Sequence, residues 1–293
     1  MAATDPWPPG PLPPGLAARV RAAALAGPSG PPAPGGAAPV ARPAATVVLL
    51  QDGAAGLEVY LLRRVAGMAF AAGMSVFPGG AVDPRDGQAP PGWCGPEPAA
   101  WARVLSADPP LVAALVAAAV RETFEETGVL LAGPDPDRVL ADTGGAGWER
   151  DRQALVAGQL SLAGLLRRRG LLLRADLLVP WAHWVTPEFE ERRYDTRFFL
   201  AALPAGQRPR DVGGEADRVH WVRPAEALAG WRRGELGLLP PTARTLADLT
   251  AYDRVAAALA AGAGRSIQPM LPRAVLVDGE ARLVLPGEPG YPA

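Results

Sequence analysis

Hydrophobic and polar positions in the first third of the chain follow a strand-like pattern. ATVVLL (45–50) and LEVYLLRR (57–64) are rich in β-branched and aliphatic residues, and QDGAAG separates them. This pattern predicts a β-hairpin. MSVFPGGAVD (74–83) predicts a short strand that runs into a glycine turn. The Pro- and Gly-rich stretch 84–110 shows little periodicity, so we expect a long loop there, inserted or functional.

The clearest helical period follows this stretch. An apolar residue recurs at every fourth position, at Val112, Val116, Val120 and Phe124. Such a stripe is typical of a helix that buries one face. Asp108 is suited to cap the helix, Pro109 to occupy its first position, and Gly128 to end it.

The rest of the chain mixes both periods. Helices are expected at 149–169 (one or two), 224–234 and 240–262, and strands at 177–185, 195–203 and 219–222. AVLVDGEARLVL predicts a further hairpin that turns at Asp278-Gly279. Because strands and helices do not alternate strictly, we expect an α/β (α+β) fold with a mixed sheet packed by helices.

Composition removes several function classes. The 293 residues carry a formal net charge of −1, which argues against a nucleic-acid-binding surface. No apolar run is long enough to span a membrane, and the N-terminus lacks a signal-peptide pattern, so we expect a cytoplasmic protein. The chain contains no Lys and no Asn, whose codons are AT-rich, so we expect a GC-rich, bacterial genome. The absence of Lys also excludes a lysine Schiff base and a P-loop.

Three glutamates stand together at the end of the predicted helix 109–127. Glu122, Glu125 and Glu126 lie where the helix dipole disfavours negative charge, and Glu122 and Glu126 are a like-charged i,i+4 pair. We therefore expect a cation to offset them. With two His and one Cys in the whole chain, the ligands of a metal would be carboxylates, which favours Mg²⁺ or Mn²⁺ over zinc.

The segment FPGGAVD…RETFEETGVLL resembles the Nudix box, GX5EX7REUXEEXGU with U aliphatic. Residues 121–129 match every specified position except the first U, which is Thr123, and Pro78-Gly79-Gly80 represents the first half. The usual spacing between the halves is expanded. Counted back from Arg121, the position of the first glutamate falls on Ala113. The interrupted box, with HWVTPEFEERRYDTRFFL downstream, is similar to peroxisomal-type coenzyme A diphosphatases.

This resemblance implies a Nudix fold, with the sheet sandwiched between helices and extra helices near the C-terminus. Composition indicates a flexible Pro/Ala-rich segment at 1–43, with a helical patch at 16–27. The resemblance implies a Nudix domain at 44–265, which leaves a tail at 266–293. The stretch 84–110 becomes an insertion within the box.

The resemblance also implies roles for single residues. Glu125 and Glu126 would be the principal metal ligands, together with the backbone carbonyl of Gly80. Glu122 would be a further ligand or the general base, and Arg121 would orient it.

Further candidates lie outside the helix. Glu215, in the loop VGGEADR, is a second candidate for the base or for a metal ligand. Gly79 would allow close approach of the ligand, and Arg63 and Arg64 would contact phosphate.

The implied reaction is metal-dependent hydrolysis of a diphosphate in coenzyme A or an acyl-coenzyme A. In the upstream signature of the coenzyme A-type relatives, Arg64 and Gly73 fit but Ala69 stands where a second arginine is expected. Nucleotide sugars or dinucleotides, such as NADH or ADP-ribose, therefore stay open as alternative substrates. So does a Nudix-fold module that binds a nucleotide without hydrolysing it, which the apparent loss of the first glutamate favours. The partner would be a small nucleotide-type molecule, and a homodimer is also left open.

Overall fold

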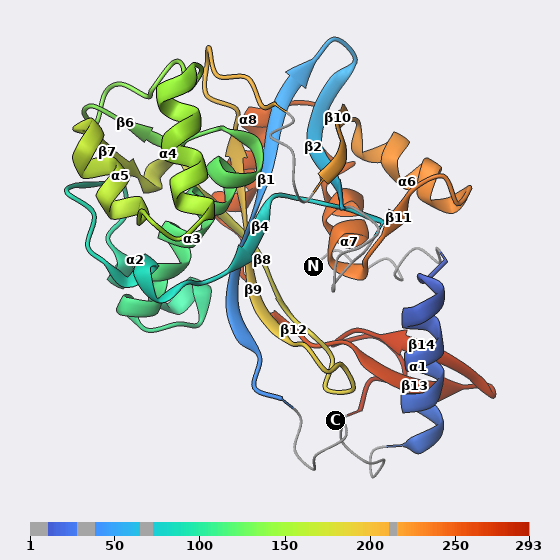
Figure 1. The fold of residues 1–293 in the computed structure, drawn as a ribbon. Helices are drawn as coiled ribbons and strands as arrows, with labels where there is room; N and C mark the ends of the chain where they lie inside the picture. Colours follow the sequence, from blue (N-terminus) through green and yellow to red (C-terminus); the bar gives the residue numbers. More distant parts are fainter. Residues whose placement is uncertain (1–10, 28–38, 65–72, 211–215, 293) are drawn as a thin grey trace.

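The protein is built around a nine-stranded mixed sheet (Figure 1). The computed structural model describes residues 11–27, 39–64, 73–210 and 216–292. The strand order is β11-β3-β2-β1-β9-β8-β12, with β10 paired to β2 and β4 paired to β1. The strands are β1 (Arg42–Gly53), β2 (Gly56–Arg64), β3 (Met74–Val76), β4 (Gly79–Ala81), β8 (Val179–Val185), β9 (Tyr194–Ala202), β10 (Ala216–Val222), β11 (Gly237–Leu238) and β12 (Pro269–Met270).

Helices cover both faces of this sheet. One layer holds α2 (Pro98–Leu105), α3 (Pro109–Thr127), α4 (Ala146–Val156) and α5 (Leu162–Arg169). The other holds α6 (Pro224–Arg232), α7 (Pro240–Leu249) and α8 (Val255–Ala263). The predicted α/β sandwich is thus confirmed, as are the first hairpin, formed by β1 and β2, and the additional helices near the C-terminus.

The sequence of β1 shows why the sheet is buried on both sides. Successive side chains of a strand point to opposite faces. Val47 and Leu49 enter the core beneath α2–α5, whereas Val48 and Leu50 enter the core beneath α6–α8. A continuous aliphatic run therefore belongs to a central strand, here paired in parallel with β9 and antiparallel with β2.

Helix α3 begins and ends where the sequence predicts. The Asp108 side chain accepts a hydrogen bond from the Leu111 N–H (2.9 Å), and Gly128 adopts φ 74° and closes the helix. The predicted apolar stripe is fully buried. The opposite side is also largely covered, because Ala114 and Ala118 are buried as well. Helix α3 is therefore a central helix rather than a surface one.

The expectation of a long irregular loop at 84–110 is wrong. This stretch contains a 3₁₀ helix η1 (Pro84–Gly87), a short strand β5 (Trp93–Cys94) and α2. β5 joins β7 (Leu172–Arg174) and β6 (Ala132–Gly133) in a second, three-stranded sheet. The many Pro and Gly residues obscure the helical spacing of two apolar residues in this stretch. Trp101 and Leu105, one helical turn apart, pack in the core against α3.

Elements at the two ends of the sequence lie together (Figure 1). The helical patch expected at 16–27 is α1 (Pro14–Ala26), and it packs on the C-terminal hairpin of β13 (Arg273–Val277) and β14 (Glu280–Val284). This hairpin turns at Asp278 and Gly279, both with positive φ, as predicted. η2 (Ala175–Leu177) completes the elements of the described residues. The predicted domain limits at 43/44 and 265/266 stay predictions.

Among the described residues, no single helix has the length and apolar composition of a membrane span. Helices α2 and α3 meet these two criteria only when they are taken together, and they are bent by 90° where they join.

Candidate functional site

The glycine pair Gly79-Gly80 brings strand β4 into close contact with α3. A methyl group at Gly80 would lie 2.4 Å from Oε1 of Glu122, and one at Gly79 would lie 2.5 Å from the Ala45 carbonyl oxygen. Both contacts are too short for a side chain. The Gly79 N–H also donates a hydrogen bond to Oε2 of Glu126 (2.9 Å). The acidic end of α3 thus lies directly against the glycine turn, as the resemblance implies.

The guanidinium of Arg121 holds the acidic cluster together. Its Nη1 donates to Oε1 of Glu122 (2.7 Å) and to Oε2 of Glu125 (3.2 Å). Its Nε and Nη2 each donate to the carboxylate of Asp86 at 2.9 Å. Burial alone would lower the pKa of Arg121, but the hydrogen bonds to Asp86 and the negative charges of the two glutamates outweigh burial and raise it. Arg121 is therefore a permanent buried cation.

Asp86 is the residue that sequence reasoning missed, and it corrects the interpretation of the box. Counted forward from Gly80, five residues intervene before Asp86, which is the spacing GX5E with Asp in place of Glu. Its side chain is 1% exposed and forms a two-pronged pair with Arg121. The first acid is thus present, and the insertion follows it. Counting back from Arg121 led to Ala113, whereas counting forward from Gly80 gives the correct residue.

The Glu125 side chain is largely shielded from solvent, which affects its charge. Burial raises its pKa to about 7, although the adjacent Arg121 opposes this rise. Its backbone carbonyl accepts a hydrogen bond from Nη1 of Arg152 (2.8 Å). A cationic side chain at this place also offsets the negative end of the helix dipole. Two arginines, Arg121 and Arg152, therefore offset part of the negative charge at the end of α3.

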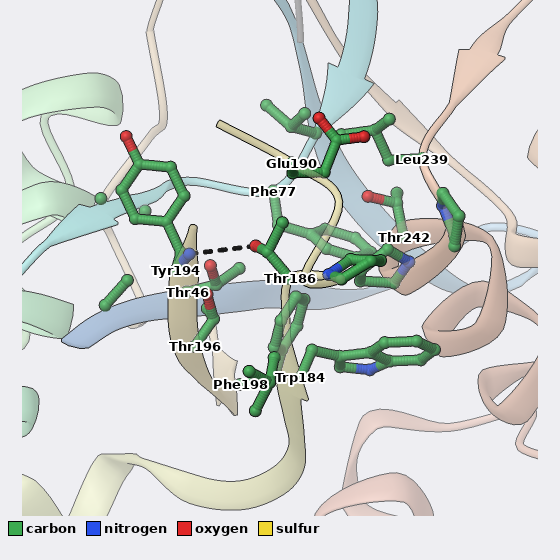
Figure 2. A pocket seen from close by; sticks show the side chains of 18 of the residues that line it. Thr46, Phe77, Trp184, Thr186, Glu190, Tyr194, Thr196, Phe198, Leu239 and Thr242 are labelled. Carbon is green, nitrogen blue, oxygen red and sulfur yellow. Dashed lines mark hydrogen bonds between the residues drawn. The ribbon is translucent and has the colours of Figure 1, made fainter. Parts of the chain in front are cut away.

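A cavity of about 410 Å³ opens beside the glycine turn (Figure 2). Glu122, Glu126, Gly79 and Gly80 line one part of it, together with Arg64 from the end of β2. Figure 2 shows side chains of Thr46, Thr196 and Phe198 from β1 and β9 in the wall. Arg19 of α1 also lines the cavity, which thus combines carboxylates, two arginines, hydroxyl groups and aromatic rings. Trp184 from β8 completes this wall, while Trp181 of the same WAHWV segment is buried in the core.

The other predicted residues are placed differently. Arg63 precedes Arg64 on β2 and so points to the opposite face of the sheet, away from the cavity lining. Arg121 and Glu125 lie behind the lining and bond to each other. Glu215 falls outside the described residues. Its role, like that of Arg63, stays a prediction.

The donor chemistry of this cavity suits a divalent cation. In the part of the chain that the structure describes, no three His, Cys, Asp or Glu side chains form a ready-made metal site. Two carboxylates, those of Glu122 and Glu126, nevertheless share the cavity wall. This arrangement fits Mg²⁺ or a similar ion, which keeps several waters and completes its shell with substrate phosphates. Glu125 as a third ligand stays a prediction, since here it bonds to Arg121.

Comparison with known proteins gives a consistent family. A family model described as the NUDT19 Nudix domain matches residues 99–249, just over half of the chain. A Nudix hydrolase from Alicyclobacillus acidocaldarius is 33% identical in sequence with a TM-score of 0.62, over 75% of this chain and 96% of that one.

Two sequence relatives carry the name acyl-coenzyme A diphosphatase NUDT19. The human protein is 30% identical over 81% of this chain and 73% of its own length. The chicken protein is 29% identical over 63% of this chain and 58% of its own length, so the match spans little more than half of that relative. Because these sequence relatives are animal proteins, they do not support the bacterial source expected from composition.

The pair of Arg121 and Asp86 provides a first test. Asp86→Asn keeps the shape but removes the charge opposite a buried guanidinium, and breaking such a pair costs about 3 kcal/mol or more. We expect this loss of unfolding free energy in denaturant titrations, together with reduced activity. Asp83→Asn is the matched control in the same segment. The Asp83 pair with Arg85 is about one-third exposed, and Asn preserves the cap of η1, so we expect a loss below about 1 kcal/mol. Equal losses in both variants would contradict the assigned role of Asp86.

Glu125 provides a pH test. Its pKa is about 7 in the folded protein against an ordinary 4.5, so the folded state binds more protons in this window and stability falls as the pH rises through it. Glu125→Gln mimics the protonated form, and its unfolding free energy should fall less over the same window. The measurement is denaturant unfolding with a chelator present, from about pH 5 to about pH 8. Identical slopes for the two proteins would rule out a raised pKa at Glu125.

Proposed function

Because the chain belongs to the Nudix hydrolase family, we propose that it hydrolyses the diphosphate of coenzyme A or an acyl-coenzyme A with the help of a divalent metal ion. The observation that carries this proposal is the cavity in which Glu122, Glu126 and Arg64 meet at the Gly79-Gly80 turn. The substrate class is supported by the activity for which the human and chicken relatives are named.

Each residue of the site has a distinct part in this reaction. Glu122 and Glu126 would hold Mg²⁺ or Mn²⁺, with the Gly80 carbonyl as a further ligand. A divalent ion there neutralises diphosphate charge and lowers the pKa of a bound water. The Gly79 N–H fixes the Glu126 carboxylate, and Arg121 fixes that of Glu122, so neither has to be ordered when substrate arrives. Arg64, which lines the same cavity, would contact a phosphate oxygen.

The chemistry adds water across one P–O bond of the diphosphate. With a coenzyme A substrate, the products are an adenosine 3′,5′-bisphosphate and a phosphopantetheine, acylated where the substrate is. The proton lost by the attacking water passes to a general base, for which Glu122 and Glu215 are the candidates. Phosphoryl transfer asks mainly for positioning and charge neutralisation, which this arrangement of fixed carboxylates and arginine supplies.

Two alternatives are weighed differently by the structure. Hydrolysis of a nucleotide sugar or a dinucleotide would use the same carboxylates. The departure from the coenzyme A signature, at Ala69, lies outside the described residues, so this alternative stays open. The non-hydrolytic binding module loses its main support, because Asp86 supplies the acid that seemed to be missing. A cytoplasmic location and a homodimer stay predictions of the sequence.

A substrate panel tests the activity. With Mg²⁺ or Mn²⁺, we expect turnover of coenzyme A or acyl-coenzyme A to exceed that of NADH, ADP-ribose and nucleoside triphosphates, measured as product formation. Glu126→Gln should lower kcat by about 10²-fold or more, since an electrostatic contact to the reacting centre is lost. Glu226→Gln, an exposed control on α6, should leave kcat unchanged. A wild-type protein inactive on every compound would favour the binding module.

Metal binding is measured separately from turnover. A ligand that binds only the folded state raises its stability, by about 2.7 kcal/mol at a concentration one hundred times its Kd. We expect Mg²⁺ or Mn²⁺ to raise the Tm, and the double variant Glu122→Gln with Glu126→Gln to lose this shift. Glu226→Gln should retain it. An equal rise in the double variant would show that the ion binds elsewhere.

A further inference from the structure

Two segments from opposite ends of the sequence close one end of the cavity. Helix α1 buries Leu16, Val20 and Ala24, one residue per turn, and packs on the hairpin β13–β14 (Figure 1). We call α1 and this hairpin the terminal module. Both segments lie outside residues 99–249, which match the family model. The family model therefore does not describe the module.

The terminal module is attached beside the cavity by two ion pairs. Nε of Arg19 lies 2.9 Å from Oε1 of Glu190, and Arg273 pairs with Glu188. Both glutamates belong to the connection between β8 and β9 (residues 186–193), part of which lines the cavity. Such partly exposed pairs add little stability, but two of them fix the position of the module.

Apart from the paired charges of Arg19 and Glu190, which also line the cavity, its end at the terminal module is mainly apolar. Leu16 of α1 and Leu283 of β14 line it, as does Pro272 just before β13. Leu239 and Pro240, at the start of α7, also contribute. This end therefore differs in chemistry from the end that holds Glu122 and Glu126.

The wall between the two ends runs across neighbouring strands. From the glycine turn on β4, the path crosses β1 at Thr46, β9 at Thr196 and β8 at Trp184, and it reaches the connection 186–193 at Thr186. Three strand spacings give roughly 14 Å. This wall carries the hydroxyl groups of three threonines and the aromatic rings of Trp184 and Phe198. A flexible arm that carries amides can bond to such hydroxyls and pack on such rings.

We infer that the terminal module binds the acyl chain of an acyl-coenzyme A whose diphosphate lies at Glu122 and Glu126. This inference rests on the proposed function. It adds that the protein prefers acylated coenzyme A over free coenzyme A as a substrate. The order of chemistry along the cavity matches the order of groups in such a substrate: carboxylates at the diphosphate, hydroxyls along the amide-bearing arm, and apolar side chains at the acyl chain. Burial of each methylene between Leu16 and Leu283 then favours binding.

The test is a chain-length series. kcat/KM is measured for free coenzyme A and for saturated acyl-coenzyme A thioesters of increasing length, with the metal held constant. We expect kcat/KM to rise by about threefold to fourfold per buried methylene until the apolar end is filled, and then to level off.

Two pairs of variants locate the effect. Leu283→Trp fills the apolar end from the hairpin, and Leu16→Trp does so from α1. Each should reduce the ratio of kcat/KM for a long acyl-coenzyme A to that for free coenzyme A, toward one. The controls are Leu276→Trp, which lies on the same face of the hairpin but is 47% exposed, and Leu25→Trp, which is 65% exposed on α1. Both controls should keep the native ratio. The two positions are independent, so a folding failure in one variant leaves the other.

The outcomes separate this inference from the proposed function. Hydrolysis of free and acylated coenzyme A with equal kcat/KM would overturn the role of the terminal module and leave the proposed function standing. A native ratio in both Leu283→Trp and Leu16→Trp would overturn that role in the same way. Failure to hydrolyse any coenzyme A species, with turnover of ADP-ribose or NADH, would instead overturn the proposed substrate and the inference that rests on it.

Discussion

The contact between Arg121 and Asp86 is the interaction on which the rest of the site depends. A guanidinium that is 9% exposed needs a partner of opposite charge, because a lone buried charge is strongly unfavourable. Asp86 supplies two of its hydrogen bonds, and the remaining donors hold Glu122, Glu125 and the Ala81 carbonyl. One cation thus joins the 3₁₀ helix, strand β4 and the end of α3. The acids of α3 are fixed as a consequence.

The glycine turn complements this contact from the other side. Because neither Gly79 nor Gly80 has a side chain, β4 can lie close to β1 and to the glutamates at once. Glu122 and Glu126 then face the cavity rather than bulk solvent, while Glu125 turns back to Arg121. The sheet supplies the wall of the cavity, and the helices on its two faces hold that wall rigid. Position, rather than an unusual residue type, creates the site.

Elements with a strong local pattern could be predicted from the sequence. The cap at Asp108, the stop at Gly128 and the turn at Asp278-Gly279 depend on neighbouring residues, and each was correct. The prediction of a loop at 84–110 failed in part because β5 pairs with β7, which is distant in the chain, so local periodicity does not show this pairing. Asp86 was missed for a related reason: its contact with Arg121 spans 35 positions, and the insertion breaks the spacing on which the motif count relied.

The distance between these two partners also affects how the site is lost. Local segments of a protein can open at a lower free energy than the whole domain. If η1 alone detaches, Arg121 loses Asp86 and the glutamates lose their fixed orientation, although both cores stay packed. Inactivation by mild heating or denaturant would then precede global unfolding, and the 3₁₀ helix η1 would act as the weakest structural support of catalysis.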